Sequence, residues 1–380
     1  MKIEAAVLRR RGAPRPYAES RPLAIETLEL DPPGQGEVLV RIAAAGLCHS
    51  DLSVIDGSRP RPVPMALGHE AAGVVEALGA DVGDLAVGNH VVMVFMPSCG
   101  HCLPCAEGRP ALCEPGAAAN GAGTLLSGAV RLHDPAMDAA AGAVHHHLGC
   151  SAFASHAVVA RRSLVKVDAD LPLHEAALFG CAVLTGVGAV INTAAVRAGQ
   201  TVAVVGLGGV GLAAVLGAIA AGAAQVIAVD LMEDKLALAR GLGASATVLA
   251  GADAAAQVRA LTAGGCDVVL EMAGSVRALE SAVAMTRRGG TTVTAGLPPA
   301  DAALPVNIVA LVGEERTLKG SYIGTCVPMR DIPRYVALYR AGRLPVDRLV
   351  SGYLSLAEIN QGFDALAEGR AVRQIVRFDR

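Results

Sequence analysis

The sequence predicts an α/β protein with a doubly wound parallel sheet and a second, β-rich part. Two observations support this fold class. From about residue 183 to residue 321, buried apolar strands alternate with helices, whereas residues 1–182 contain short strands bounded by glycines. The tail, residues 322–380, returns to mixed character. A chain of 380 residues is long enough for two domains.

The β-rich part is predicted from local sequence patterns. GEVLVRIAAAG at 36–46 and AAGVVEALG at 71–79 have strand character and are bounded by glycine. The prolines at 60–64 indicate a loop. Residues 114–149 are rich in glycine and alanine without clear periodicity, so we expect a long irregular segment that leads into a strand in SAFASHAVVA.

The parallel sheet is predicted from a regular order of segments. The order is strand TVAVVG, helix GLAAVLGAIAAG, strand QVIAVD, helix KLALARGLGA, then strands CDVVLEMAG and TTVTAGLP. Continuous apolar strands that alternate with helices are typical of a sheet covered on both faces. Residues 201–229 carry no charge and superficially resemble a membrane span, but their glycines would break such a helix, so we expect none.

Composition disfavours several classes of function. The net charge is −3, which gives no basic stripe for nucleic acid and no polybasic surface for a membrane. Tryptophan is absent, and tyrosine and phenylalanine number five each, so an aromatic platform for stacking bases is not expected. The first twenty residues lack the apolar run of a secretory signal, and we expect a cytoplasmic protein.

A glycine-rich turn predicts where a dinucleotide binds. Gly206-Leu207-Gly208-Gly209-Val210-Gly211 fits G-x-G-x-x-G, follows a strand and opens a helix. Gly206 would make the tight turn, Gly208 would let the backbone approach the pyrophosphate at the helix N-terminus, and Gly211 would permit close packing. The pattern predicts a Rossmann dinucleotide-binding domain; the alternative is a glycine-rich turn without a ligand.

An acidic residue after the second strand of this unit favours NAD. Asp230 follows Gly211 by 19 residues. Its carboxylate can accept hydrogen bonds from the adenosine ribose and would repel a 2′-phosphate, which favours NAD over NADP. Lys235 can also reach the ribose; the alternative is a solvated helix lysine.

Four cysteines lie within fifteen residues, at Cys99, Cys102, Cys105 and Cys113. The spacing C-x2-C-x2-C-x7-C lets thiolates close a tetrahedral shell around one zinc ion with no open position. We therefore predict a structural zinc lobe at about 95–115. Two disulfides are the alternative, and they suit an intracellular composition less well.

A second metal site is suggested by three scattered residues. Cys48, His69 and Cys181 would form a Cys2His zinc site with one open position. Sequence spacing alone does not show that they converge, and each type is common as a buried core residue.

Together these motifs resemble the zinc-dependent medium-chain alcohol dehydrogenases, specifically the long branch related to the classical and the glutathione-dependent enzymes. The resemblance runs from CHSD through GHE, the cysteine lobe, GCAVLTGVGAV and GLGGVG to the tail GRAVRQIVRF. It implies a GroES-like catalytic domain at 1–182 and 322–380 around an NAD-binding Rossmann domain at 183–321, with the active site between them. It also implies NAD, two zinc ions per subunit and a homodimer or homotetramer.

The resemblance implies a role for each residue of the metal site. Cys48, His69 and Cys181 would bind the catalytic zinc, which would stabilise the charged form of an alcohol substrate. Glu70 would lie nearby as an outer-shell or alternating ligand. Asp51 would orient His69.

The resemblance also implies contacts with coenzyme and substrate. His49 and Arg373 would contact the pyrophosphate, and Thr185 would pack near the nicotinamide. Ser50 would accept the alcohol proton as hydride moves to the nicotinamide. The expected reaction is reversible oxidation of an alcohol to an aldehyde or ketone, with primary, aromatic or ω-hydroxy alcohols as the expected substrates.

Several positions depart from the family pattern. Ser53 stands where a relay histidine is common, so the outer relay would use His49, water or another route. Ala117 stands where glutathione-dependent enzymes carry arginine, which disfavours a glutathione adduct as substrate.

The expected substrate pocket also departs from the pattern. Phe95 matches an aromatic lining position, whereas Arg59 and His147 stand where apolar residues usually line the channel. They suggest a polar pocket for a substrate with a distal polar or acidic group. Alternatively, Arg59 points to solvent and the run 145–147 is a surface feature.

Other functions remain as alternatives. A glutathione-dependent or dismutase-type formaldehyde dehydrogenase with tightly held NAD is the nearest, and a zinc-free quinone or enoyl reductase would lack both cysteine sets. A structural or nucleic-acid-binding member of the superfamily is disfavoured by the intact ligand set and the charge.

Overall fold

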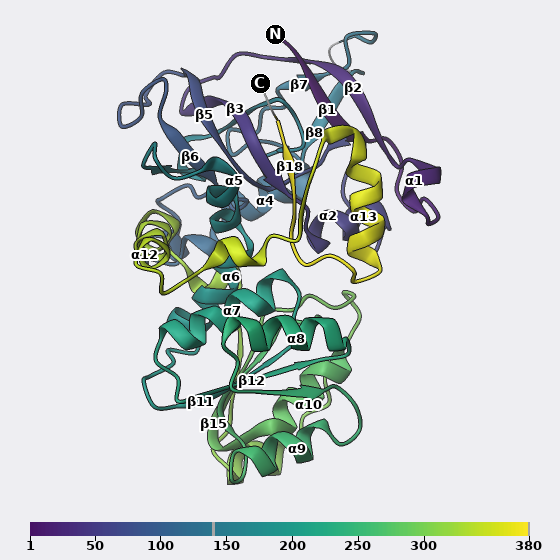
Figure 1. The fold of residues 1–380 in the computed structure, drawn as a ribbon. Helices are drawn as coiled ribbons and strands as arrows, with labels where there is room; N and C mark the ends of the chain where they lie inside the picture. The colour runs from purple at the N-terminus through teal and green to yellow at the C-terminus, as the bar shows by residue number, and fades with distance from the viewer. Residues whose placement is uncertain (139–140, 379–380) are drawn as a thin grey trace. The chain divides into compact units, whose positions relative to one another are not determined.

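The computed structural model describes residues 1–138 and 141–378, and its chain divides into two compact units (Figure 1). The first unit contains Met1–Cys181, Val327–Pro333 and Val350–Arg380, and the second contains Ala182–Cys326 and Arg334–Leu349. The domain boundaries expected from the sequence differ in the tail, because 322–326 and 334–349 belong to the second unit.

The reason for this difference is local packing in the tail. The Arg343 guanidinium donates a 3.1 Å hydrogen bond to the Ala220 carbonyl, and Arg348 donates one of 2.8 Å to the Gly241 carbonyl. Leu344 is fully buried in the same segment. These contacts fasten residues 334–349 to helices of the parallel sheet.

The second unit contains the predicted doubly wound sheet. Its six strands within residues 182–349, all of which are described, are parallel in every pairing. They run in the order β13 (Ala246–Leu249), β12 (Gln225–Asp230), β11 (Thr201–Val205), β14 (Cys266–Glu271), β15 (Thr286–Thr294) and β16 (Thr317–Gly320). The central strands are buried along almost their whole length, as parallel strands covered on both faces should be.

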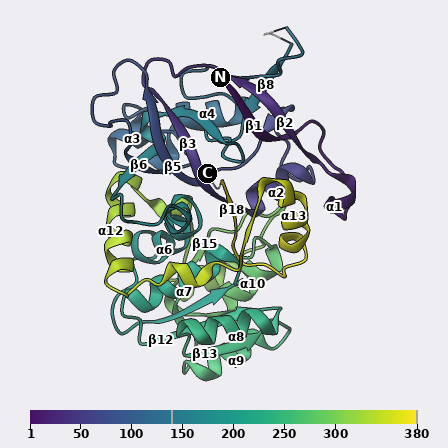
Figure 2. The same cartoon turned by 45° about the horizontal axis from the view of Figure 1, so that its top comes forward.

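Helices connect these strands. They are α7 (Gly209–Ala220), α8 (Glu233–Leu242), α9 (Ala254–Leu261) and α10 (Val276–Met285). Figures 1 and 2 show α8, α9 and α10 packed beside the strands. The sequence pattern did not single out β13, α9, α10 or β16.

The first unit contains an antiparallel sheet. The strand order is β10 (Leu164–Val167), β6 (His90–Met93), β5 (Glu70–Leu78), β3 (Glu37–Gly46), β18 (Gln374–Arg377) and β17 (Gly352–Leu354), and β9 (His156–Ala160) also pairs with β3. Only the β17–β18 pairing is parallel among the described residues of this sheet. The C-terminal strand β18 therefore lies beside β3, as both cartoon views show.

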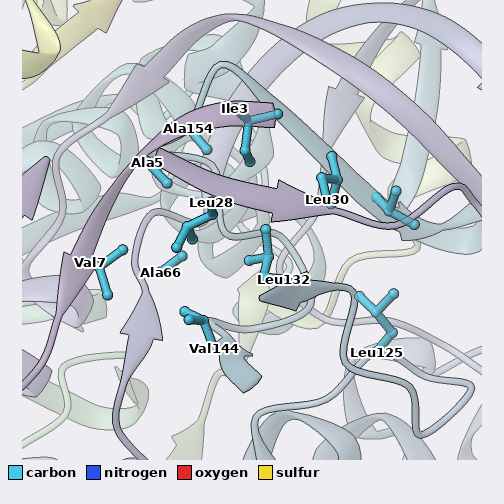
Figure 3. Close-up of a cluster of buried hydrophobic side chains, with 11 residues drawn as sticks. Ile3, Ala5, Val7, Leu28, Leu30, Ala66, Leu125, Leu132, Val144 and Ala154 are labelled. Carbon is cyan, nitrogen blue, oxygen red and sulfur yellow. The ribbon is translucent and has the colours of Figure 1, made fainter. Parts of the chain in front are cut away.

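A closed barrel completes the strands of the first unit. It is formed by β1 (Lys2–Leu8), β2 (Leu23–Leu30), β7 (Leu132–His133), β8 (Ala143–His146) and β4 (Met65–Ala66). Ile3, Ala5 and Val7 alternate along β1 and point into the barrel core, where they meet Leu28 and Leu132 (Figure 3). Ala6 and Leu8, on the opposite face, are also fully buried, so β1 is covered on both faces from Ala5 onward.

The remaining α-helices are mostly short. They are α1 (Tyr17–Ser20), α2 (His49–Ile55), α3 (Leu103–Ala106), α4 (Glu114–Ala122), α5 (Leu173–Ala176), α6 (Ala182–Gly188), α11 (Ile308–Gly313), α12 (Pro328–Arg340) and α13 (Ile359–Ala367).

The expectation of an irregular segment at 114–149 was wrong in part, because α4, β7 and β8 lie there. Cys113 caps α4 by accepting the Gly116 amide at 3.3 Å, and Gly123 ends the helix in the left-handed region at φ 71°. These end signals outweigh the weak periodicity of the segment.

The apolar stretch 201–229 forms β11, α7 and most of β12. In the described part of the chain, no single helix has the length and hydropathy to cross a membrane. The helices Leu173–Gly180 and Ala182–Thr193, which are bent relative to each other, have that length and hydropathy only when they are taken as a pair.

Candidate metal centres and cofactor loop

Strand ends bring the predicted metal ligands together. In the antiparallel pair β3–β5, Gly46 lies opposite Glu70, so Cys48 just beyond β3 and His69 just before β5 meet at the same edge. A side chain at Gly46 would collide with the Glu70 carboxylate, since its Cβ would lie 2.4 Å from Oε1. Gly68, with φ +93°, turns the chain into β5, and a Cβ there would lie 2.4 Å from the Phe153 amide nitrogen.

The third cysteine reaches this edge from a different segment. Cys181 follows the 3-10 helix Ala177–Gly180, and a Cβ at Gly180 would lie 2.3 Å from the Met93 carbonyl at the end of β6. Cys181 Sγ lies 3.5 Å from His69 Nε2. The donor atoms of Cys48, His69 and Cys181 all lie within 4.8 Å of one another, and all three residues are buried.

The chemistry of these donors fits a zinc ion. A hydrogen bond from Cys181 lowers the pKa of Cys48 well below its usual value, against the effect of burial, and the nearby His69 and Arg373 add to the lowering. The pKa of Cys181 is raised well above its usual value, first by its hydrogen bond to Cys48 and then by burial. A second thiolate here would be repelled by the first, and a divalent cation between the two removes that repulsion.

Asp51 sits behind His69, as the resemblance implied. Its Oδ1 lies 3.1 Å from His69 Nδ1 and accepts the Gly68 amide at 3.0 Å. An N–H on Nδ1 leaves the Nε2 lone pair facing the sulfur atoms, which is the tautomer that a metal needs. Burial lowers the pKa of His69, but Asp51 and Cys48 raise it more, and the net shift is well upward.

His147 is a second histidine on the same carboxylate. Its Nδ1 lies 3.0 Å from Asp51 Oδ1, and its ring meets the His69 ring edge-on at 5.5 Å. His147 and His146 are each 1% exposed, so the alternative that 145–147 forms a surface feature was wrong for these two residues. Sequence reasoning placed His147 in the pocket but missed its contact with Asp51.

Other residues expected in the site take several positions. Phe95 is buried and meets the His69 ring edge-on at 5.3 Å. Arg59 is half-buried in the loop after α2. His49 is exposed and Ser50 half-buried in the first turn of α2, directly after Cys48.

Glu70 and Arg373 form a buried ion pair. Arg373 Nη1 lies 3.2 Å from Glu70 Oε2 and donates a 3.0 Å hydrogen bond to the Leu47 carbonyl. Arg373 immediately precedes β18, whose Ile375 pairs with Gly46, and so it reaches the same strand edge. Burial lowers the pKa of Arg373, but Glu70 and Cys48 raise it more, so the guanidinium stays charged.

The four-cysteine lobe forms a second donor cluster. The sulfur atoms of Cys99, Cys102, Cys105 and Cys113 lie within 4.8 Å of one another. The Cys102 amide donates to Cys99 Sγ at 3.3 Å, and the Cys99 amide donates to Cys113 Sγ at 3.1 Å. All nine cysteines are described and are free thiols, which excludes the disulfide alternative in this structure.

Backbone amides donate hydrogen bonds to sulfur atoms of this lobe and so favour the thiolate form that binds a cation. Burial raises the pKa of Cys99, but the amides of His101 and Cys102 lower it more, to about 6. Burial raises the pKa of Cys105 to about 12. Four soft sulfur donors with preformed amide–sulfur hydrogen bonds fit a closed zinc site.

The predicted dinucleotide loop has the expected geometry in the second unit. Gly206 has φ +91°, and its Cβ would lie 2.6 Å from the Ala273 amide nitrogen. A Cβ at Gly211 would lie 1.8 Å from the Gly206 carbonyl oxygen, so only glycine permits this close approach. Gly208, the N-cap of α7, has no heavy atom within 4 Å of its Cβ position, which leaves space for a ligand.

Asp230 holds this loop from the end of β12. Its Oδ2 accepts the Leu207 amide at 2.6 Å and its Oδ1 accepts the Met232 amide at 2.9 Å. Asp230 as a whole is 8% exposed. Lys235 is half-buried in the first turn of α8, and Thr185 is half-buried in α6.

Glu271 is a loop-positioning residue that sequence reasoning missed. Its Oε1 accepts the amides of Ala273 (2.8 Å) and Gly274 (2.6 Å), and Thr294 donates to its Oε2 at 2.7 Å. Because Ala273 packs against Gly206, Glu271 fixes one wall of the glycine loop. An acidic residue that ends the apolar strand CDVVLE was the available signal.

The fold and donor sets define an α/β protein that carries a buried Cys2His centre in one unit and a dinucleotide-type loop in the other. Two family descriptions match: "Alcohol dehydrogenase GroES-like domain" at residues 34–169 and "Zinc-binding dehydrogenase" at residues 209–340. The chain belongs to the zinc-dependent medium-chain alcohol dehydrogenases.

Named relatives cover the full length of the chain. NDMA-dependent alcohol dehydrogenase of Amycolatopsis methanolica is 40% identical, covering 99% of each chain. Geraniol dehydrogenase of Castellaniella defragrans is 39% identical, covering 100% of this chain and 98% of that one. The crystal structure of benzyl alcohol dehydrogenase from Acinetobacter calcoaceticus superposes with a TM-score of 0.92 at 33% identity, covering both chains fully.

Proposed function

We propose that this protein is an NAD-dependent alcohol dehydrogenase with two zinc ions per chain. It would reversibly oxidise primary alcohols with an aromatic or unsaturated group, or ω-hydroxy alcohols, to aldehydes. The convergence of Cys48, His69 and Cys181, with Asp51 behind His69, is the observation that carries the proposal. The relatives named for geraniol and benzyl alcohol favour primary alcohols that carry an unsaturated or aromatic group.

The chain's own residues have defined tasks in this reaction. A zinc ion held by Cys48, His69 and Cys181 would supply a Lewis acid that lowers the pKa of the alcohol hydroxyl, and NAD would supply the hydride acceptor. Ser50, two residues after Cys48, would accept the alcohol proton, and exposed His49 would pass it to solvent. Phe95 covers one side of His69 and would exclude water from the reacting carbon.

The cofactor proposal rests on the loop around Gly208 and on Asp230. A buried carboxylate that already anchors the loop disfavours a 2′-phosphate on the adenosine ribose, so we propose NAD. Arg373 and His49 would balance the pyrophosphate charge, Thr185 would pack near the nicotinamide, and Lys235 would reach the ribose.

We further propose a homodimer or homotetramer that works in the cytoplasm. The free thiols suit a reducing compartment. The edge strand β16 is exposed along its length, and Ile308, Val309 and Val312 of the neighbouring helix α11 are 71–83% exposed. An open strand edge beside an apolar helix is a typical contact surface for a second copy.

Metal analysis and a substrate panel test the proposal. We expect about two zinc ions per chain, and activity with geraniol, benzyl alcohol and ω-hydroxy acids that depends on added NAD and is weaker with NADP. Fewer than one zinc per chain in active protein would reject the metal assignment, and a preference for NADP would reject the role of Asp230.

A second candidate is an enzyme that does not release its reduced cofactor to solution. One relative is named for dependence on NDMA and not on NAD, which leads us to keep this candidate. Purified protein would then carry cofactor absorbance and convert aldehyde without added NAD, whereas the first proposal expects neither.

A further inference from the structure

The Asp51 carboxylate is anchored almost entirely through one oxygen atom. Asp51 Oδ1 is approached by the Gly68 amide, His69 Nδ1 and His147 Nδ1, at 3.0, 3.1 and 3.0 Å. Within residues 1–138 and 141–378, Asp51 Oδ2 has no hydrogen-bond partner, and His147 Nδ1 reaches Oδ1 as a close N···O contact that lacks the alignment of a full hydrogen bond. A carboxylate held on one oxygen can pivot about it, so each group on that oxygen restrains the rotation.

His147 supplies one of these restraints from an independent part of the fold. It follows β8 of the barrel, whereas Asp51 lies in α2 and His69 precedes β5. Its edge-on contact with the His69 ring also limits the tilt of that ring. His147, Asp51 and His69 are each 0–1% exposed, so no bulk solvent can replace a lost contact.

We propose that His147 is a positioning residue of the catalytic metal centre, acting through Asp51 to hold His69 with Nε2 directed at the two cysteines. This inference rests on the proposed zinc site at Cys48, His69 and Cys181. It assigns to His147 a task at the metal centre rather than a contact with the far end of the substrate. Outer partners of metal-binding histidines typically change metal affinity by about 10–100-fold when removed.

A matched pair of variants distinguishes the effect of the His147–Asp51 contact from the effect of the space that the His147 ring fills. His147→Asn keeps an N–H donor close to the original Nδ1, whereas His147→Leu has the same branched arrangement of side-chain heavy atoms as asparagine and no donor. His147→Phe keeps a ring and removes the donor. Each variant is compared with wild type for zinc loss to a chelator and for the absorption bands of the cobalt-substituted centre.

We expect His147→Leu and His147→Phe to lose the catalytic zinc roughly tenfold faster than wild type, with altered cobalt bands. His147→Asn should stay within about threefold of wild type. Equal rates in the asparagine and leucine variants would overturn the proposal, even if the phenylalanine variant does not fold.

A double-mutant cycle tests whether His147 acts through Asp51. We expect Asp51→Asn combined with His147→Leu to lose zinc no faster than Asp51→Asn alone, because both changes remove the same restraint. Fully additive effects would contradict this route. The zinc content of the wild type distinguishes failure of the proposed function from failure of this inference. A wild type without catalytic zinc rejects the proposed function. A zinc-loaded wild type whose variants lose zinc at the wild-type rate rejects only the role of His147.

Discussion

His146 shows how a single buried residue couples the protein to pH. Its Nε2 accepts the Arg131 amide at 3.0 Å, which requires the neutral ring, and burial lowers its pKa to about 3. An unfolded histidine takes up a proton near pH 6.5, whereas the folded one does not. The stabilisation is therefore complete above about pH 6.5 and is lost as the pH falls toward 3.

We predict that His146 lowers the free energy of unfolding by about 1.4 kcal/mol for each pH unit below 6.5. His146→Gln retains an acceptor for the Arg131 amide and should remove that slope. Calorimetric unfolding at pH 7 and pH 5 measures the effect, with His174→Gln as the control. If the unfolding midpoint differs between pH 7 and pH 5 by the same amount in His146→Gln as in wild type, protonation of His146 does not affect stability.

At the scale of elements, the turn into α7 makes a glycine-specific prediction. Gly211→Ala places a methyl group 1.8 Å from the Gly206 carbonyl and should destabilise the protein by roughly 1–3 kcal/mol. Gly208→Ala meets no heavy atom within 4 Å and should leave the unfolding midpoint unchanged. It should nevertheless weaken NAD binding about tenfold or more in a calorimetric titration, because the methyl group stands where the pyrophosphate would approach.

Gly208→Ala is the decisive member of this pair. Normal NAD affinity in that variant would mean that the cofactor does not approach the backbone at the N-cap of α7.

The two proposed zinc sites should differ in function. Cys102→Ser should release the lobe zinc and lower the unfolding midpoint by roughly 5 °C or more, since the lobe has little apolar core of its own. Cys48→Ser should also lose one zinc, yet keep the fold and lose nearly all turnover. Zinc content, calorimetry and steady-state rates measure all three quantities.

The reverse pattern would contradict this division of roles. If Cys48→Ser is unfolded while the lobe variant is zinc-depleted but active and normally stable, the structural role belongs to the Cys48 site and not to the lobe.

At the scale of the whole molecule, the exposed edge of the parallel sheet predicts assembly. Val309→Asp adds a charge to the apolar surface beside β16 and should shift the protein toward monomer in analytical ultracentrifugation. Val87→Asp alters a residue of the first unit that is 65% exposed and serves as the control. Equal sedimentation of wild type and Val309→Asp would place any subunit contact elsewhere.

The sequence alone determined the parallel sheet, the glycine loop and the cysteine lobe. Each depends on local information: continuous apolar strands, φ-permissive glycines at fixed spacing, and four donors within fifteen residues. The packing of 334–349 with the second unit and the helix α4 were not predicted, because buried contacts and helix caps decided them.

Only the tertiary structure decided which scattered residues meet. Cys48, His69 and Cys181 converge because the pairing of Gly46 with Glu70 aligns the ends of β3 and β5 and because Gly180 packs against Met93. The same folding brings His147 from the barrel to the Asp51 carboxylate. Donors far apart in sequence carry no local signal of their contact, since strand register and close packing across elements create it.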